Sequence, residues 1–361
     1  MSVFDRIGSE YEQIVFGHDP DSGLRTIIAV YSTARGPALG GTRMWAYPNE
    51  EEALADAMRL GKAMAYKAAC ADLPLGGGKA VIIGDARRDK NDDLMRAYGR
   101  KVERLAGTYI TTADVGTTVR DLDVISETTR YVTGTSGGSG DPSPVTAHGV
   151  WHGLRAVAEI AFGEPSLRGR HAVVQGVGKV GSGVARMLAE EGARVTVSDI
   201  DDVAARTLAD EIGADVVDVS EVLEVPCDVL SPCALGPIVT DKTLGLFRCR
   251  AIAGAANNQL EQPSLARELA HAGILYAPDY VINAGGLINV EDELHGYDAA
   301  RAHRKAEAIA DTLRAIFRDA DRAGITPSEA ADRLAATRIA EAQRQSRTPL
   351  GGDKPQGRLP A

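Results

Sequence analysis

The chain of 361 residues is longer than a typical single domain, which favours two domains. It is 44% hydrophobic and 25% charged, so each domain could bury a core. A formal net charge of −10 argues against a nucleic-acid partner, which requires a basic surface. No apolar run approaches the ~18 residues of a membrane span, and the acidic first residues show no secretory signal. We therefore expect a cytoplasmic protein with no membrane partner.

The four cysteines lie far apart and form no C-x-x-C pair. Buried free thiols in a reducing cytoplasm are the expected state of all four. They are Cys70, Cys227, Cys233 and Cys249.

The first part of the chain predicts mixed strands and helices. The turn-forming sequence DPDSG separates apolar runs at 13–17 and 24–31, which predicts an antiparallel strand pair. Apolar residues recur at helical spacing from Glu50 to Ala71 after an acidic start, which predicts an amphipathic helix. Further on we expect a buried strand at 80–83, a polar helix at about 91–105 and a strand at 108–112.

The segment 134–144 is rich in Gly, Ser and Pro and is the predicted linker between the domains. Beyond it strands alternate with helices, which predicts a parallel sheet covered on both faces. One long helical tract is expected from Ala299 to about Arg344, followed by a disordered tail. The strands are expected at 171–175, 194–198, 214–217, 228–230, 251–254 and 274–277, with helices ending at about Glu191 and Ile212.

A dinucleotide-binding motif follows the strand at 171–175. GVGKVG fits G-x-G-x-x-G, in which the glycines allow a tight turn, close approach of a pyrophosphate and close helix packing. The N-terminus of the following helix favours phosphates. Asp199 ends the next strand, where a carboxylate binds the ribose hydroxyls and repels a 2′-phosphate, so the predicted cofactor is NAD. The alternative is an ordinary glycine turn beside a surface aspartate. The predicted contacts are Gly176, Gly178, Val180, Gly181, Asp199 and Ile200.

Three charged residues in the first half are candidates for chemistry. Lys79 lies between three glycines and a buried strand, and Lys67 lies on the amphipathic helix. Burial or mutual repulsion would lower the pKa of either ammonium, and a lysine near neutrality can act as a general base. Asp114 follows a strand end, where α/β proteins often place functional groups. Taken singly, each could equally be a solvated surface residue.

Seven segments together resemble a known family. The chain is similar to the leucine, valine and phenylalanine dehydrogenases of the Glu/Leu/Phe/Val dehydrogenase family from about residue 10 to about 345. The resemblance implies NAD-dependent, reversible oxidative deamination of leucine, valine or isoleucine to the 2-oxo acid, ammonia and NADH by a homo-oligomer. The matching segments are PALGGTRMW (37–45), LPLGGGK (73–79), TADVGTT (112–118), DPSPVTAHGV (141–150), GVGKVG (176–181), APDYVINAGGLINV (277–290) and DELHGY (292–297).

The resemblance also implies residue roles. Lys79 would be the general base, Lys67 would pair with the substrate carboxylate, and Asp114 would assist proton transfer and position the amine. Gly40 and Gly41 would bring the backbone close to the substrate. Thr146, Asn257 and Asn283 would contact the cofactor, and Leu39, Leu287 and Val290 would line an apolar side-chain pocket. Leu287 replaces the smaller valine or alanine of relatives, so we expect preference for branched substrates over phenylalanine. Glutamate is excluded, because its distal carboxylate would lack a partner.

The implied architecture is an α/β fold with a cleft between two domains. Residues 1–135 would form the substrate, catalytic and oligomerisation domain, and 136–330 a doubly wound Rossmann-type NAD domain. In 331–361 a helix would return toward the first domain, with a disordered tail.

Two features depart from the family pattern. Asp141 replaces the usual asparagine before P-S-P-V-T, and its role is open. His148 and His152 have the i,i+4 spacing of a metal-binding pair. No third ligand is apparent in the sequence and the family has no metal there, so we predict none.

Two other function classes fit the sequence less well. A 2-hydroxy-acid dehydrogenase would require a His with a carboxylate or Arg, and the sequence has no such motif. A catalytically silent NAD-binding protein would be expected to lose Lys79 or Asp114, and both are present.

Overall fold

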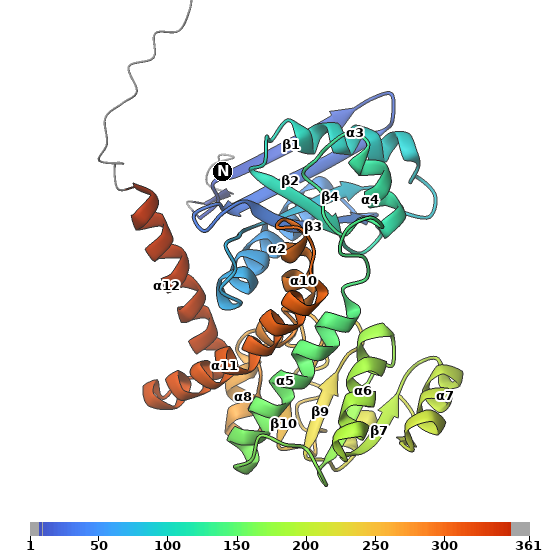
Figure 1. Cartoon of the computed structure of the whole chain (residues 1–361), viewed down its shortest axis with the longest axis vertical. Coiled ribbons are helices and arrows are strands. Elements are labelled where there is room, and N and C mark those ends of the chain that lie inside the picture. The colour runs from blue at the N-terminus through green and yellow to red at the C-terminus, as the bar shows by residue number, and fades with distance from the viewer. Residues whose placement is uncertain (1–6, 9, 348–361) are drawn as a thin grey trace, which may run out of the picture.

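The computed structural model describes residues 7, 8 and 10–347, which form two α/β regions, each on its own sheet (Figure 1). The first sheet has the strand order β1-β2-β4-β3-β5, and the second has the order β11-β10-β9-β6-β7-β8. The predicted tail lies outside the described residues from 348 onward. Within the described part, no helix combines the length and apolarity that crossing a membrane requires.

The first sheet is mixed. β1 (Gln13–Asp19) and β2 (Leu24–Ser32) form the predicted antiparallel pair around the DPDSG turn. β4 (Gly76–Ile83) pairs antiparallel with β2 and parallel with β3 (Ala38–Trp45), which in turn runs parallel to β5 (Tyr109–Ala113). The sequence reasoning did not predict β3, because two glycines interrupt its apolar pattern.

Alternate residues of this sheet face opposite layers of helices. On one face Ile27 and Val81 pack with the alanines of α2 (Glu50–Cys70). On the other, Ile28 and Ile82 join a cluster that includes residues of α3 (Asp92–Glu103) and α4 (Val119–Ser126). Because successive side chains of a strand point to opposite faces, both faces of this sheet are buried beneath helices.

Small residues bring α2 close to β4 and β2. A Cβ atom on Gly77 would lie 2.0 Å from the backbone N of Ala65, and one on Gly61 would lie 3.2 Å from the carbonyl O of Ala29. The glycine triplet, which the sequence reasoning placed before the strand, is thus part of β4. This close packing sets Lys67 of α2 and Lys79 of β4 on the same side of the molecule.

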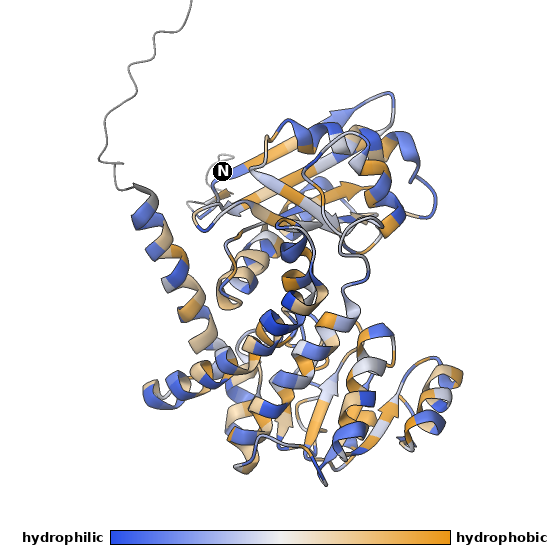
Figure 2. Ribbon diagram, in the orientation of Figure 1, coloured by the Kyte–Doolittle hydropathy of each residue, from blue (hydrophilic) through white to orange (hydrophobic). Residues whose placement is uncertain are grey.

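The second sheet is entirely parallel, as predicted from the strand–helix alternation. Figure 2 shows that its central strands are mainly hydrophobic and that the surrounding helices carry both hydrophobic and hydrophilic residues. The strands are β6 (His171–Gln175), β7 (Arg194–Ser198), β8 (Asp215–Val216), β9 (Val229–Pro232), β10 (Ala251–Ile252) and β11 (Leu275–Tyr276), and the helices are α5 (Ser143–Phe162), α6 (Lys179–Glu191), α7 (Asp202–Ile212) and α8 (Leu265–His271), with a short 3₁₀ turn at Val222–Glu224.

Four helices complete the described part of the chain: α9 (Asp279–Ile282), α10 (Gly285–Glu293), α11 (Ala299–Ala323) and α12 (Pro327–Arg347). The long helical tract predicted from Ala299 is interrupted and forms two helices. Gly324 adopts a φ of 63° and ends α11, because a left-handed residue terminates a helix. α12 then packs on α2, where Arg338 donates to the carbonyl of Ala69 at 2.7 Å.

The glycine-rich segment between the two regions is tied to α10. Glu293 accepts hydrogen bonds through Oε2 from the backbone N of Gly134 at 2.8 Å and of Ser139 at 2.9 Å. One carboxylate on α10 therefore holds the start of the connection into α5.

Candidate active site

A cleft of about 480 Å³ opens between the two regions and takes side chains from both. The first region contributes residues of β3, β4, β5 and α2, and the second contributes residues of α5, α6, α9, α10 and the 233–235 and 255–258 segments. Eleven residues proposed from the sequence line this cleft: Leu39, Gly41, Lys67, Lys79, Asp114, Thr146, Val180, Asn257, Asn283, Leu287 and Val290.

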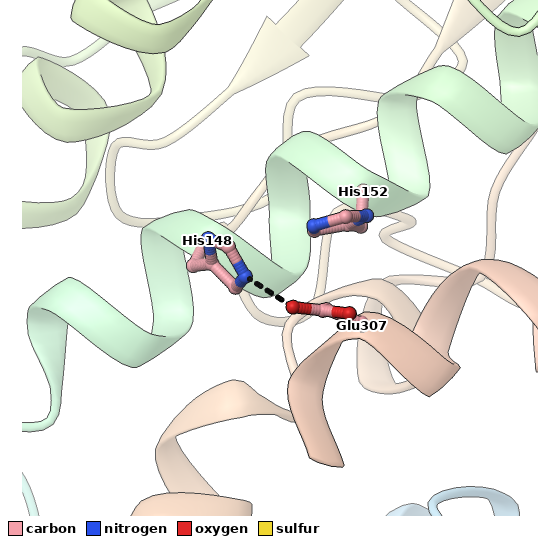
Figure 3. Close-up of side chains that lie close together, drawn as sticks. All are labelled: His148, His152 and Glu307. Atoms are coloured by element: carbon pink, nitrogen blue, oxygen red, sulfur yellow. Dashed lines mark ion pairs between the residues drawn. The ribbon is translucent and has the colours of Figure 1, made fainter. Parts of the chain in front are cut away.

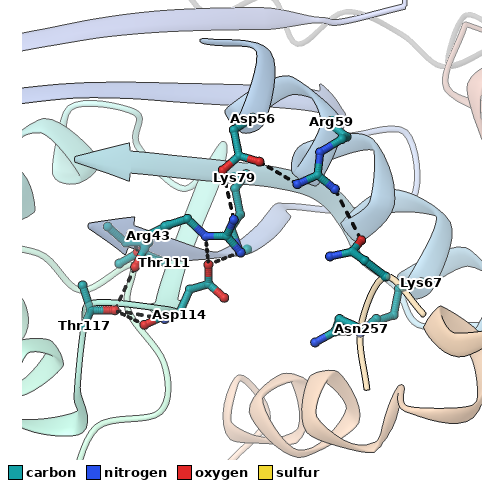
Figure 4. A network of polar contacts seen from close by, with 12 residues as sticks. Arg43, Asp56, Arg59, Lys67, Lys79, Thr111, Asp114, Thr117 and Asn257 are labelled. Carbon is teal, nitrogen blue, oxygen red and sulfur yellow. Dashed lines mark hydrogen bonds and ion pairs between the residues drawn. The ribbon is translucent and has the colours of Figure 1, made fainter. Parts of the chain in front are cut away.

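Lys79 and Asp114 are in direct contact at the base of the cleft (Figure 4). The Lys79 Nζ lies 2.9 Å from Oδ2 of Asp114, and Nε of Arg43 donates to the same oxygen at 2.9 Å. The Lys79 residue is only 5% exposed. A carboxylate that is held by an arginine and contacts a buried lysine is an arrangement suited to proton transfer.

The environment changes the pKa of each group. Burial lowers the pKa of Lys79 below the ordinary 10.5, although Asp114 opposes this. Burial of Asp114 favours its neutral form, but Lys79 and Arg43 outweigh that effect and hold its pKa below 3.8. Asp114 is thus ionised and Lys79 is displaced toward the neutral amine that a base requires.

Lys67 lines the same cleft and is linked to the second region. Burial lowers its pKa to about 8, with Asp279 opposing the shift and Lys79 adding to it. Its Nζ donates to Oδ1 of Asn257 at 3.3 Å, and Nδ2 of Asn283 donates to the same oxygen at 2.8 Å. Oδ1 of Asn283 is buried and has no hydrogen-bond partner within the described residues. A proposed substrate residue and a proposed cofactor residue are therefore joined through Asn257.

A second layer of charges supports Asp114 and was not found from the sequence. Arg43 also donates to Asp56 at 3.0 Å, and that carboxylate accepts from Tyr47 at 2.7 Å and from Arg59 at 2.6 Å. Arg43 was visible inside the segment GGTRMW, where a cation on an otherwise buried strand needs a partner.

Asp279 is a further cleft residue that the sequence reasoning did not single out. Its pKa is raised, chiefly by burial. It accepts a hydrogen bond from the backbone N of Gln259 at 3.0 Å. The only indication of its role in the sequence was its position in the segment APDYV.

The two adjacent glycines of β3 have different roles. Gly41 lines the cleft, and a Cβ there would lie 2.8 Å from Cβ of Asp114. Gly40, expected to approach the substrate, is not among the cleft residues. A Cβ on Gly40 would lie 1.7 Å from the carbonyl O of Gly78, so its glycine is required by the pairing of β3 with β4.

The glycine motif forms a strand–turn–helix. Gly176 has a φ of 92°, and a Cβ on Gly181 would lie 1.9 Å from the carbonyl O of Gly176, so both positions need glycine for the fold itself. A Cβ on Gly178 would meet no atom of the chain within 4 Å. Asp199 accepts from the backbone N of Val177 at 2.7 Å, and the neighbouring Ile200 is 94% exposed.

Asp141, the residue without a role in the sequence reasoning, contacts this motif. Its Oδ2 lies 2.9 Å from Nζ of Lys179, the first residue of α6. Its Oδ1 accepts from the backbone N of Ser143 at 3.0 Å. Asp141 thus connects the start of α5 to the glycine motif through an exposed ion pair.

Comparison with known proteins agrees with this geometry. A family model described as Glu/Leu/Phe/Val dehydrogenase, dimerisation domain, matches residues 11–131. A second, described as Glutamate/Leucine/Phenylalanine/Valine dehydrogenase, matches residues 137–207 and 204–347. The chain is 51% identical over 352 residues to a leucine dehydrogenase of Thermoactinomyces intermedius, covering 96% of each chain. It is 48% identical over 339 residues to a valine dehydrogenase of Streptomyces albus, covering 92% of this chain and 93% of that one.

Solved structures of related enzymes share the fold. L-tryptophan dehydrogenase from Nostoc punctiforme superposes with a TM-score of 0.85 at 44% identity, covering 94% of this chain and 98% of that one. A glutamate dehydrogenase from Thermus thermophilus has a TM-score of 0.76 at 24% identity, covering 96% of this chain and 91% of that one, which shows the fold alone. With both family models matched in order along almost the whole chain, this protein belongs to the Glu/Leu/Phe/Val dehydrogenase family of amino-acid dehydrogenases.

Proposed function

We propose that this amino-acid dehydrogenase acts on leucine, valine and isoleucine with NAD. The reaction consumes the L-amino acid, NAD⁺ and water, and releases the 2-oxo acid, ammonium, NADH and a proton. The observation that carries the proposal is the meeting of Lys67, Lys79 and Asp114 in one apolar-walled cleft beside Asn283.

Each charged group has a task that its surroundings favour. The Lys67 ammonium would pair with the α-carboxylate of the substrate. The ionised Asp114 would hold the substrate amine and offset the positive charge that develops on it as the imine forms. Lys79 would take a proton from the water that attacks the imine carbon, and would return it to the departing amine. Arg43 keeps Asp114 oriented between them.

The residues around the cleft fit a nicotinamide cofactor, which when bound supplies the acceptor for the hydride on the substrate Cα. The buried, unpartnered Oδ1 of Asn283 is suited to accept from an amide N–H. The open surroundings of Gly178 leave room for a pyrophosphate at the N-terminus of α6. Asp199 can accept further hydrogen bonds from ribose hydroxyls, since a carboxylate has about four acceptor positions.

The cleft walls support an apolar substrate side chain. Leu39, Met64, Leu287 and Val290 provide the lining, and the neighbouring Arg43 is engaged by two carboxylates. A second candidate is an aromatic substrate, because the tryptophan dehydrogenase superposes over nearly the whole chain. The size of Leu287 favours the branched substrates over phenylalanine and tryptophan.

We also propose a cytoplasmic homo-oligomer. The match of residues 11–131 to a dimerisation domain supports assembly through the first region. Phe16 lies on the edge strand β1 and is 61% exposed, as expected for a residue that an interface would cover. All four cysteines are free, which fits a reducing compartment.

One assay tests the substrate and cofactor together. NADH formation is measured with each of the twenty L-amino acids, and the best substrates are repeated with NADP. We expect the highest kcat/KM for a branched aliphatic substrate with NAD and no turnover of glutamate. A highest kcat/KM for tryptophan or phenylalanine would replace the branched-chain proposal by the aromatic one.

A further inference from the structure

A cluster of metal-binding side chains lies outside the cleft, between two helices that pack against each other. His148 and His152 lie one turn apart on α5, and Glu307 faces them from α11 (Figure 3). None of the three lines the cleft. The sequence showed the histidine pair but gave no sign of the third group, because Glu307 is more than 150 positions away along the chain.

The distances suit a shared ion. One ligand atom from each of the three side chains lies within 4.8 Å of the other two. Nε2 of His148 and Oε1 of Glu307 are 3.5 Å apart. Two ligands bound at roughly 2.0–2.1 Å to a tetrahedral zinc ion lie about 3.4 Å from each other, so this pair already has the required spacing.

One of these atoms makes no hydrogen bond. Nε2 of His148 is inaccessible to solvent and makes no hydrogen bond within the described part of the chain, and it faces the Glu307 carboxylate at 3.5 Å. A buried imidazole nitrogen without a hydrogen bond carries a desolvation cost that an ion bound between it and Glu307 would remove.

The groups around the three side chains are engaged elsewhere. His303 lies one turn before Glu307 on α11, with its ring centroid 5.0 Å from that of His148, but its Nδ1 contacts the carbonyl of Ala299 at 2.8 Å and it does not belong to the group of three ligands. A water molecule would therefore be the fourth ligand. The arginines near His152 each have a carboxylate partner, since Arg314 binds Glu159 at 2.7 Å and Arg155 lies 4.0 Å from Glu191.

We propose that His148, His152 and Glu307 bind one divalent transition-metal ion of the zinc class, which cross-links α5 to α11. Two imidazoles and a carboxylate suit Zn²⁺, Co²⁺ and Ni²⁺ and do not suit Mg²⁺ or Ca²⁺. α5 follows the segment that connects the two regions, and α11 packs along α5. The ion would therefore stabilise the packing of these two helices. The site takes no part in the deamination chemistry.

The binding test uses the full-length, untagged protein stripped of metal with a chelator. Titration calorimetry with ZnCl₂ is expected to show one ion per chain, weakened at least tenfold in His148→Ala and in Glu307→Gln. Glu307 has a side chain that is 49% exposed, so its substitution leaves packing intact even if His148→Ala folds poorly. His271→Ala is the matched control, because His271 forms an exposed histidine–glutamate pair on α8 without a second histidine. It should bind zinc as the wild type does.

Two further measurements separate this site from adventitious binding. Co²⁺ should give visible bands of a four-coordinate ion without the near-ultraviolet band that a cysteine thiolate ligand would produce. At a hundredfold excess over Kd, Zn²⁺ should raise the Tm by roughly 5 °C in the wild type and in His271→Ala, and not in Glu307→Gln. Zinc binding or a Tm rise that is equal in Glu307→Gln and wild type overturns the proposal, as does the spectrum of aqueous Co²⁺.

Discussion

Replacing Lys79 by alanine tests the proposed chemistry most directly. The change removes a buried amine that contacts Asp114 at 2.9 Å, and no other described amine in the cleft can replace it, because Lys67 is held by Asn257. A positioned general base contributes roughly 10²–10⁴-fold, or about 3–5 kcal/mol of barrier. We therefore expect kcat/KM for deamination to fall by at least a hundredfold.

The same variant should leave cofactor binding nearly unchanged. Lys79 belongs to β4 of the first sheet, whereas the glycine motif and Asp199 belong to the second. Asp114 will lose the cation that lowers its pKa most strongly, so its pKa should rise while Arg43 keeps it partly lowered. NAD affinity, measured by fluorescence titration, should stay within about twofold of the wild type.

A pH profile strengthens the test. The neutral amine is the active form, so wild-type kcat/KM should rise with pH as Lys79 deprotonates, at a pKa below 10.5. Lys79→Ala should lose this acidic limb. Lys62→Ala is the control, since Lys62 is a partly exposed lysine on α2 that pairs with Glu10. Activity of Lys79→Ala within tenfold of wild type, or an unchanged acidic limb, would refute the assignment of Lys79 as the base.

Three further predictions address binding. Because the pKa of Lys67 is about 8, its ammonium is lost above that pH, so KM for the amino acid should rise between pH 8 and 10; steady-state kinetics across this range check it, and a flat KM contradicts the carboxylate role. Asp199→Ala should raise the ratio of NADP to NAD kcat/KM by at least tenfold, since it removes a charge beside the ribose; a wild type that uses both cofactors equally rules out the ribose contact. Leu287→Ala should raise kcat/KM for phenylalanine relative to valine by about tenfold or more, because it lengthens the pocket; a wild type that already prefers phenylalanine shows that the pocket is assigned wrongly.

Sequence patterns correctly predicted the elements whose geometry depends on residues close together in the chain. The β1–β2 pair followed from a turn sequence between two apolar runs, and the parallel sheet followed from alternating strands and helices. The structure adds detail where a single residue overrides a sequence pattern. Gly324 divides the last helical tract, because its left-handed backbone ends α11 while the apolar spacing continues into α12. The glycines of β3 and β4 made these strands hard to recognise in the sequence. A glycine adds no hydrophobic side chain to the strand pattern, although its small size is required for close packing.

By itself the sequence determined which side chains are available for chemistry, since Lys67, Lys79, Asp114 and the glycine motif stand in recognisable segments. Their meeting in one cleft was decided by the tertiary structure. Arg43 reaches Asp114 because β3 lies beside β5, and Glu307 reaches His148 because α11 packs along α5. Such contacts join residues tens to hundreds of positions apart. Periodicity describes only one element at a time, so strand register and helix packing determine which distant charges come within bonding distance.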